Sequence, residues 1–556
     1  DVESRGLGDV YKRQPQEGEK ICEKERVQAK HVFVTPAGET VVDFGQEVTG
    51  YVEFTVDAEA GQEIRILHGE VLDAEGNFYR DNYRDAKAEL RYVCREGIQT
   101  WHPLLTFFGF RYLKLEEFPG EAKPEQFTAI AVYSDLRKTG HLRCGVPELN
   151  QLFSNILWGQ RGNFLDVPTD CPQRDERLGW TGDAEVFVKT ASYNFDVEKF
   201  FVKWLHDLAA DQFENGAVGH VVPDYLQNPI PSAAWGDAAT ICPWQIYQTY
   251  GNRKVLEDQF GSMKQWVDYI THATTTPNLW TGGTHYGDWL GLDAPSGSYK
   301  GSSREDLIAS AFYALSTQLV IQAGHVLGED VEAYEELYPA IVSAFRSAYP
   351  EYRTQTEYTV AVWFGLAEYP QQSADELAEL VKKDGCRLRT GFVGTPFLLH
   401  VLSRYGHEDL AYTLLLRREY PSWLYPVTKG ATTIWEHWDG IMEDGGFWSA
   451  DMNSFNHYAY GSVADWIYEE AAGIRPLEPG FARVQVAPKP DRRLGWLEAS
   501  IETRNGVVRS RGEYRDGGVR YEIETEMPVI VVIDGTERSM PAGNYIFWGS
   551  EKEKNR

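Results

Sequence analysis

The chain begins and ends with segments in which apolar and polar residues alternate, and its long middle part has a helical spacing instead. The alternation predicts strands, because successive side chains of a strand point to opposite faces of a sheet. Turn-forming Gly, Asp and Asn residues separate the first of these segments, which is typical of an antiparallel β-sandwich. The predicted strands lie at residues 40–44, 50–56, 63–68, 90–93, 111–115 and 127–132.

The hydrophobic spacing becomes helical near Gly140, and Pro147 stands where the first turn of a helix tolerates proline. Roughly a dozen helices, joined by loops rich in Trp, Gly, Asp and His, favour an (α/α)6 barrel of paired helices. A helical solenoid is the alternative, but no fixed sequence period supports it. The predicted helices lie at residues 147–158, 184–193, 197–212, 238–250, 254–273, 304–327, 333–347, 373–384, 396–404, 409–415 and 462–470, with a further candidate at 355–366.

Alternation returns after Gly480, at residues 482–487, 497–501 and 519–523, so a small C-terminal β-sandwich is expected. Asn505-Gly506 and Asp516-Gly517 are strong signals for hairpin turns. The start of the chain has neither an initiator Met nor a signal-peptide pattern, which suggests a leader foreign to the fold. The predicted order is a possible non-native leader at residues 1–16, an N-terminal β-sandwich at 17–137, an (α/α)6-barrel catalytic domain at 138–474, a C-terminal β-sandwich at 475–550 and a frayed tail at 552–556.

Composition narrows the classes of partner. With 556 residues the chain is too long for one ordinary core. Its net charge of −29 repels nucleic acid and anionic membrane surfaces, so we expect neither partner and a neutral substrate. No uninterrupted apolar run reaches the roughly 18 residues of a membrane-spanning helix. The 17 Trp, 31 Tyr and 26 Phe residues offer flat faces that suit sugar rings, although a large core uses them equally.

The six cysteines are far apart and form no CxxC pair, and no HExxH spacing occurs. These patterns argue against a zinc site and against a disulfide scaffold, so we expect no metal and no cofactor. The GxSxG and GxxxxGK[ST] motifs are also missing from the sequence. A reducing compartment fits the cysteine usage, so a cytoplasmic location is expected, and a homodimer is one assembly that the sequence allows.

The stretch at residues 166–183 concentrates charged chemistry between two helical patterns. It contains five carboxylates, two arginines and Trp180, and its prolines and glycines exclude one regular helix or strand. Loops on a helical scaffold often carry binding or catalytic residues. A solvated structural loop is the alternative, although it does not explain the presence of Leu178 and Trp180.

Other loops of the helical region have a similar composition. Most of them place a carboxylate, an amide or a histidine beside Trp, Tyr or Gly, which suits the hydroxyl groups and the apolar face of a sugar. A glycosidase needs two carboxyl groups, one protonated and one ionised. Other readings remain open: His457 also fits a core histidine, and Trp435 and Trp438 fit the core equally well. The loops are Trp235-Gly236-Asp237, Gly287-Asp288-Trp289 and residues 391–396, 433–440 and 453–458.

Residues 170–183 (DCPQRDERLGWTGD) closely resemble the signature of the bacterial α-L-rhamnosidases of glycoside hydrolase family 78. Residues 433–440 (TIWEHWDG) resemble the second catalytic motif of that family, and residues 454–458 (SFNHY) resemble its third. The resemblance extends from about residue 30 to the end of the chain, and the first motif is long and specific. It implies a β-sandwich, an (α/α)6 barrel and a second β-sandwich, in that order.

The resemblance further implies an inverting hydrolase that releases terminal α-L-rhamnose from glycosides or oligosaccharides. Glu176 matches the general acid and Glu436 the general base, and inversion implies carboxyl groups ~6.5–9.5 Å apart. An apolar wall facing the methyl group of this 6-deoxy sugar is also implied. The expected sugar-binding residues are Asp170, Arg174, Trp180, Asp183, Trp235, Asp237, Asp288, Trp289, Trp435, Trp438 and His457.

Two competing functions remain at this point. Another (α/α)6 glycosidase would share the barrel but act on a different sugar, since fold alone does not fix function. A non-catalytic sugar-binding protein would keep the pocket, but the presence of both Glu176 and Glu436 argues against it. Many family members have further N-terminal β domains, sometimes including a calcium-dependent sugar-binding module, and we expect those domains to be either absent here or lost with a truncated start.

Overall fold

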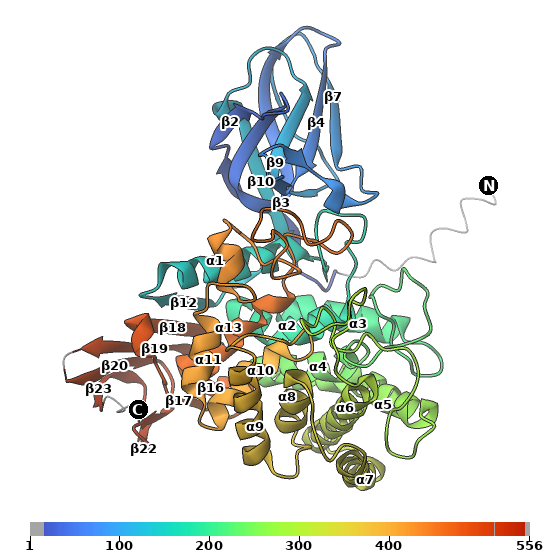
Figure 1. Ribbon diagram of the computed structural model, residues 1–556, viewed down its shortest axis with the longest axis vertical. Coiled ribbons are helices and arrows are strands. Elements are labelled where there is room, and N and C mark those ends of the chain that lie inside the picture. Colours follow the sequence, from blue (N-terminus) through green and yellow to red (C-terminus); the bar gives the residue numbers. More distant parts are fainter. Residues whose placement is uncertain (1–15, 516, 551–556) are drawn as a thin grey trace, which may run out of the picture.

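The computed structural model of the protein describes residues 16–515 and 517–550. Figure 1 shows a β-rich N-terminal domain above a helical domain, with a second β-rich domain at the lower left. This arrangement confirms the predicted fold class of a helical barrel flanked by two antiparallel β domains. The predicted leader and the predicted tail lie outside the described residues, apart from Gln16.

The N-terminal domain buries an apolar core beneath one curved antiparallel sheet, in which eight of its strands take part. Two further short strands pair with each other at the side of that sheet. The strands are β1 (Ile21–Gln28), β2 (His31–Val34), β3 (Thr40–Ala58), β4 (Glu63–Gly69), β5 (Val71–Leu72), β6 (Phe78–Tyr79), β7 (Glu89–Val93), β8 (Gly97–Trp101), β9 (Phe108–Glu117) and β10 (Phe127–Ser134).

Strand β3 organises this domain, because β2, β8, β9 and β10 all pair with it. The sequence predicted two strands where the structure has one, and that prediction was wrong. The register of β3 is irregular between Asp43 and Val48, yet the strand continues. Gly45 explains why: it adopts a φ of 68°, and its N–H donates to Asp43 Oδ1 at 2.6 Å. This geometry bends the strand without ending it.

The helical domain follows β12 (Gly140–Cys144), and its helices agree with the predicted ranges to within a few residues. The short helix α12 was missed, and the predicted helix at 462–470 is a composite of 3-10, α and π turns. The helices are α1 (Pro147–Asn163), α2 (Thr181–Asn194), α3 (Glu198–Asp211), α4 (Ala238–Tyr250), α5 (Arg253–Ala273), α6 (Glu305–Leu327), α7 (Glu332–Ala348), α8 (Gln355–Trp363), α9 (Pro370–Lys383), α10 (Thr395–Arg404), α11 (Glu408–Leu415), α12 (Leu424–Thr428) and α13 (Val463–Trp466).

Six helices form a closed inner ring. Helix α2 packs on α4, and the contacts continue through α6, α8 and α10 to α13, which packs back on α2. Helices α3, α5, α7, α9 and α11 cover this ring from outside. Burial follows the same division: α2 buries 13 of its 14 residues, whereas α7 fully buries only Ile341 and Phe345. A helix that is buried all round belongs in a core, so the ring is the predicted (α/α)6 barrel and not an open solenoid.

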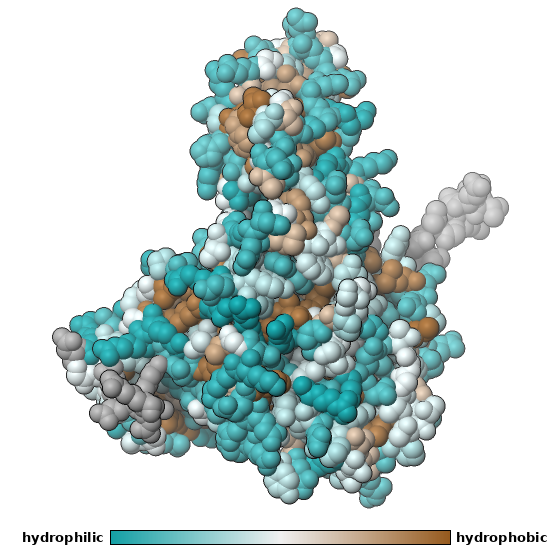
Figure 2. All heavy atoms as spheres, viewed as in Figure 1, coloured by the Kyte–Doolittle hydropathy of each residue, from teal (hydrophilic) through white to brown (hydrophobic). Residues whose placement is uncertain are grey.

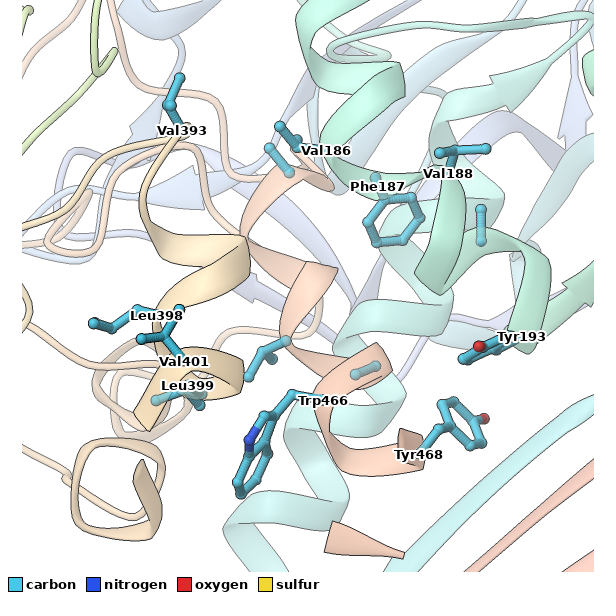
Figure 3. Close-up of a cluster of buried hydrophobic side chains, with 14 of the residues drawn as sticks. Val186, Phe187, Val188, Tyr193, Val393, Leu398, Leu399, Val401, Trp466 and Tyr468 are labelled. Atoms are coloured by element: carbon cyan, nitrogen blue, oxygen red, sulfur yellow. The ribbon is translucent and has the colours of Figure 1, made fainter. Parts of the chain in front are cut away.

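Polar contacts between α2 and the last helical segment close the ring. Thr190 Oγ1 donates to the carbonyl of Ser462 at 2.9 Å, and Tyr193 OH donates to Glu469 at 2.6 Å. Figure 3 shows apolar side chains of α2, α10 and the α13 segment that lie together in the core, with Trp466 among them. The closure brings the first and last parts of the helical domain side by side.

Among the described residues, helix α6 is long and apolar enough, by length and composition, to cross a membrane. Polar residues interrupt its apolar run, so the expectation that no uninterrupted run is long enough still holds. In the structure, 78% of its most apolar window is buried inside the protein. Its hydrophobicity follows from its position in the inner ring.

The C-terminal domain packs two sheets together, and one of its strands comes from the start of the helical region. Strand β12 pairs with β18, although the sequence assigned residues 138–474 to the barrel. The hairpins predicted at Asn505-Gly506 and Asp516-Gly517 join β18 to β19 and β19 to β20, with Asp516 outside the described residues. The strands are β16 (Ile474–Pro476), β17 (Val484–Val486), β18 (Trp496–Thr503), β19 (Gly506–Arg515), β20 (Gly518–Thr525), β21 (Val529–Ile533), β22 (Thr536–Met540) and β23 (Gly543–Gly549).

Hydrophilic residues cover most of the face seen in Figure 2, and hydrophobic residues appear there only in small scattered groups. This surface agrees with the net charge of −29. The large apolar content of the chain is used instead in the barrel core, where the closing helix α13 contributes Trp466.

We expect Trp466→Ala to lower the free energy of unfolding of the barrel by about 3–5 kcal/mol, because it empties part of a close-packed core. Trp466 is 1% exposed, and its indole N–H donates to Ser403 Oγ at 2.9 Å. Chemical denaturation followed by circular dichroism measures the change. The control is Trp548→Ala on β23, where the side chain is 59% exposed and little should change. Equal losses in the two variants would contradict the inner-ring position of Trp466.

Candidate active site

The charged loop before α2 is closed on itself by two hydrogen bonds. The N–H of Asp170 donates to the carbonyl of Leu178, and the N–H of Leu178 donates to Asp170 Oδ1, each at 2.9 Å. Gly179 then passes very close to Val222, where a Cβ atom would lie 2.1 Å from the carbonyl oxygen. The loop therefore has one defined shape, which turns its side chains towards the barrel.

Arg174 lies at the centre of the charged groups and is 2% exposed. Its Nη1 and Nη2 donate to the two carboxylate oxygens of Glu436, at 2.6 and 3.0 Å. Nη2 also lies 3.0 Å from Glu176 Oε2 and 3.4 Å from Asp170 Oδ2. A planar guanidinium suits such forked contacts with carboxylates. The structure thus brings together the two predicted catalytic residues, which are 260 positions apart in the sequence.

The main chain also holds Glu436 in place. The N–H of Ser454 donates to Glu436 Oε2 at 2.9 Å, and the N–H of Glu436 donates to the carbonyl of Ser454 at 2.9 Å. Burial alone would raise the pKa of Glu436, but the charge and hydrogen bonds of Arg174 lower it to about 2. Glu436 is therefore ionised at any ordinary working pH.

The spacing of the two carboxyl groups stays a prediction. Glu176 Oε2 and Glu436 Oε1 each lie 3.0 Å from the same nitrogen of Arg174, so these two oxygens are at most twice that distance apart. This limit applies to one pair of oxygens, whereas the ~6.5–9.5 Å expected of an inverting pair applies to the carboxyl groups. Arg174 holds both groups near each other.

The N-terminal domain contributes a residue to this site that sequence reasoning missed. Arg84 Nη2 donates to Glu176 Oε2 at 3.0 Å, and Arg84 Nη1 lies 3.4 Å from Asp175 Oδ1. Arg84 follows the 3-10 turn η1 (Asp81–Tyr83), 92 positions before Glu176. No motif around Arg84 signals this contact, since it depends on how the two domains pack. The side chain of Glu176 remains 18% exposed, so it stands at the open side of the cluster.

His457 and Asp183 form a second buried pair beside Glu436. His457 Nε2 lies 3.0 Å from Asp183 Oδ2. Burial would lower the pKa of His457, but the carboxylate of Asp183 and the nearby charge of Glu436 raise it. Burial and the charge of Glu176 raise the pKa of Asp170 to about 7, against the effect of Arg174. His457 therefore lies in the site as the buried partner of Asp183, and the carboxylates around it favour its charged form.

Aromatic rings form a wall next to the charged cluster. The Trp180 ring lies 5.9 Å from Tyr286, which in turn lies 4.6 Å from Trp235 and 5.4 Å from Trp289. Burial and the negative charge of Glu176 raise the pKa of Tyr286 to about 12, which places its ring near the carboxylate. Tyr286 was missed, although it directly precedes the predicted Gly287-Asp288-Trp289 loop. Trp180, Trp235 and Trp289 thus lie together around Tyr286, and their contact with a sugar stays a prediction.

Asp237 and Asp288 lie elsewhere, and the structure contradicts their prediction as sugar-binding residues. Asp237 accepts from Trp266, Ser316 and the N–H of Ala234. Asp288 accepts from Thr356 and from the backbone N–H groups of the loop at 391–394. Both carboxylates are fully engaged inside the protein, so they fix the loops that carry Trp235 and Trp289.

Trp435 and Trp438 also fall within the core, which decides a point that the sequence left open. The Trp435 ring packs edge-on against Phe455 at 5.1 Å, and the Trp438 ring stacks on Tyr460 at 4.2 Å. Both indoles are buried. The sequence assigned Trp435 and Trp438 to sugar binding because they lie close to Glu436 along the chain. Neighbouring residues on a turn point in different directions, so closeness in sequence does not place both indoles in the site.

Three possible metal ligands meet in the charged loop. Within the described residues, oxygen or sulfur atoms of Asp170, Cys171 and Glu176 lie within 4.8 Å of one another. Arg174 contacts both carboxylates of this group, so a positive charge already occupies the position that a cation would take. The site can therefore bind hydroxyl groups and move protons with its own side chains.

Comparisons with known proteins were made for the whole chain. The bacterial alpha-L-rhamnosidase 6 hairpin glycosidase domain matches residues 137–471, the concanavalin-like domain of the same proteins matches residues 34–133, and their C-terminal domain matches residues 473–538. An alpha-L-rhamnosidase from Formosa agariphila is 38% identical over 536 residues, which is 94% of this chain and 58% of that protein. One from Streptomyces avermitilis is 40% identical over 499 residues, which is 88% of this chain and 48% of that protein.

Solved structures agree with these matches. The crystal structure of Streptomyces avermitilis alpha-L-rhamnosidase complexed with L-rhamnose has a TM-score of 0.91 at 37% identity, covering 95% of this chain and 54% of that one. The native enzyme from Aspergillus terreus has a TM-score of 0.92 at 33% identity, covering 96% of this chain and 64% of that one. The chain spans about half the length of the curated relatives it matches.

We expect Asp288→Ala to lower the free energy of unfolding by about 3 kcal/mol or more, because it leaves several buried donors without an acceptor. Those donors are Thr356 and the N–H groups of Gly391 and Val393. In contrast, Glu176→Gln should change stability by less than about 1 kcal/mol, since Glu176 lies at the open side of its cluster. Denaturant unfolding of both variants distinguishes a residue that supports the site from one that acts in it. A stable Asp288→Ala variant would contradict the structural role.

Proposed function

The chain belongs to the family of bacterial alpha-L-rhamnosidases, and from that premise we propose that it hydrolyses terminal α-L-rhamnosidic bonds of glycosides or oligosaccharides. The observation that carries the proposal is that Glu176 and Glu436 both contact one buried arginine, Arg174. Glycoside hydrolysis needs two such carboxyl groups. The rhamnose complex of the Streptomyces avermitilis relative, at 37% identity, supports the choice of sugar.

Glu176 is the proposed general acid. It lies at the open side of the cluster, where the leaving group and solvent have access. The acid donates its proton to the glycosidic oxygen as the bond to the anomeric carbon breaks. After that transfer, Glu176 would be a carboxylate beside Arg84 and Arg174, both within 3.0 Å of Oε2. The two guanidinium groups therefore stabilise the product state of the acid.

Glu436 is the proposed general base. It takes a proton from a water molecule that attacks the anomeric carbon on the face opposite the leaving group, and the anomeric configuration inverts. A base must be ionised, and Arg174 keeps Glu436 so by lowering its pKa to about 2. The same ion pair makes Glu436 a weak base, so catalysis requires the hydrogen bonds from Arg174 to loosen when sugar and water enter.

The remaining residues of the site suit a neutral deoxy sugar. Asp170, Asp183 and His457 offer hydrogen-bonding groups for hydroxyls at the base of the cluster. Trp180 and Tyr286 provide an apolar wall, which fits the methyl group of rhamnose better than a hydroxymethyl group. An uncharged substrate also avoids repulsion from a protein with a net charge of −29.

We expect Glu176→Ala and Glu436→Ala each to lower kcat for natural α-L-rhamnosides by at least about 10²-fold, because each removes one proton-transfer group. Asp175→Asn is the matched control, since Asp175 is the exposed neighbour of Glu176 and has no proposed role in proton transfer. Steady-state kinetics with a rhamnosyl flavonoid or a rhamnose disaccharide measures the effect. Near-wild-type rates in both Ala variants would overturn the assignment.

The anomer that is released first tests the stereochemistry separately. Proton NMR of the first-formed sugar should show the inverted anomer before mutarotation mixes the two forms. A retained anomer would show that one carboxylate acts as a nucleophile and would contradict the acid-and-base assignment. If calorimetry shows that the wild-type protein binds rhamnose but no rhamnoside is hydrolysed, the protein is a sugar-binding protein instead.

We expect Arg174→Lys to shift the acid limb of the kcat/KM profile towards higher pH by about one unit or more, with a larger shift for Arg174→Met. Burial raises the pKa of Glu436 and Arg174 lowers it, so weakening the arginine contact lets burial dominate. The base is then protonated at a higher pH, and activity on the acid side is lost earlier. Arg177→Met, at an exposed position in the same loop, should leave the profile unchanged. An unshifted acid limb in both Arg174 variants would contradict the role of Arg174.

A further inference from the structure

A cavity of about 200 Å³ lies between the N-terminal domain and the barrel, on the far side of the segment that holds Glu436. Glu47 on β3 and Glu70 after β4 line it from the N-terminal domain. The loop at 429–433 and the ring of Phe455 line it from the barrel. The cavity does not include Glu176, Arg174 or the aromatic wall, so it is separate from the proposed catalytic site.

Two buried carboxyl groups in the lining of this cavity have oxygens with no hydrogen-bond partner within the described residues. Glu47 is 3% exposed, and neither of its side-chain oxygens has a hydrogen-bond partner within the described part of the chain. Glu70 is 2% exposed. Its Oε1 also has no hydrogen-bond partner within the described part of the chain, whereas its Oε2 accepts a hydrogen bond from Asn82 at 2.6 Å. Burying charged oxygens in this way is costly unless an opposite charge compensates them.

The cationic side chains at the edge of the cavity are already engaged elsewhere. Arg111 makes a forked contact with Asp43, at 3.0 and 3.3 Å, and its Nη1 donates to the carbonyl of Gly430. Lys429 Nζ donates to the carbonyls of Met442 and Glu443. Arg111 is paired with Asp43, and within the described residues no cationic side chain forms an ion pair with Glu47 or Glu70.

We propose that this cavity binds a hard divalent cation of the calcium and magnesium class, with Glu47 and Glu70 as its protein ligands. Such ions prefer carboxylate, carbonyl and water oxygens. The cavity of about 200 Å³ has room for an ion with several waters, since one water takes about 30 Å³ of liquid volume. A neutral sugar would also fit by size, but it would leave the charge of the carboxylates uncompensated.

A cation at this position would brace the junction between the two domains. The N–H of Glu47 donates to Thr432 Oγ1 at 2.9 Å, so Glu47 already contacts the barrel loop. The N–H of Phe455 donates to Glu70 Oε2 at 3.4 Å, and Phe455 directly follows Ser454, whose N–H holds Glu436. The proposed ion therefore supports the catalytic segment from behind without touching substrate.

Isothermal titration calorimetry and thermal unfolding of the full chain test the proposal, after removal of metals with a chelator. Addition of CaCl₂ or MgCl₂ should give one saturable site and raise the melting temperature. Glu47→Gln and Glu70→Gln should each weaken cation binding by more than about tenfold, since each loses a charged ligand. Both variants should fold, because each replaces an uncompensated charge by a neutral group of equal size. Glu443→Gln, with an exposed side chain near the cavity, is the matched control and should bind as wild type does.

Three results would overturn the proposal. The first is the absence of both binding heat and a melting-temperature shift with either cation. The second is equal cation binding by wild type, Glu47→Gln and Glu70→Gln. The third is a second rhamnose site that disappears in Glu47→Gln, since that would assign the cavity to a neutral sugar. Neither readout depends on hydrolytic activity, so the result stands apart from the proposed function.

Discussion

One buried guanidinium group holds the proposed catalytic centre of this protein together. Arg174 contacts Glu436, Glu176 and Asp170 at once, in a position where removing any charged group from water costs several kcal/mol. The carboxylates that Arg174 contacts offset that cost. The loop, the barrel segment and the Arg174 side chain are therefore assembled together. The same arginine keeps Glu436 ionised and lies beside Glu176, the proposed proton donor.

Closure of the helical ring makes this assembly possible. Arg174 comes from the loop before α2, the first inner helix, and Glu436 comes from the segment that leads to α13, the last. The contacts between α2 and α13 bring the two segments together. The N-terminal domain completes the site, because Arg84 reaches Glu176 from above the barrel. The active site is therefore a product of three regions that are remote in sequence.

The acidic residues in and around the two proposed sites fall into two groups, according to whether protein donors engage all of their carboxylate oxygens. Asp237 and Asp288 have every oxygen engaged by protein donors, so they act as internal anchors for loops. Glu176 is partly exposed, and Glu47 and Glu70 keep oxygens that no described protein donor reaches. Oxygens of the second kind are available to a substrate, a water molecule or an ion. The distinction depends on surroundings and is invisible in the residue type.

The sequence by itself determined the elements, the fold class and the two catalytic candidates. Periodicity depends on local geometry, so the helices were predicted to within a few residues, and the motif at 170–183 identified Glu176. Sequence patterns did not separate anchors from sugar contacts, which is why Asp288 and Trp435 were misassigned. Only the tertiary structure decided which side each residue faces, that Arg84 joins the site, and that β12 belongs to the C-terminal sheet. Each of these depends on long-range packing, and packing is set by contacts that no local pattern encodes.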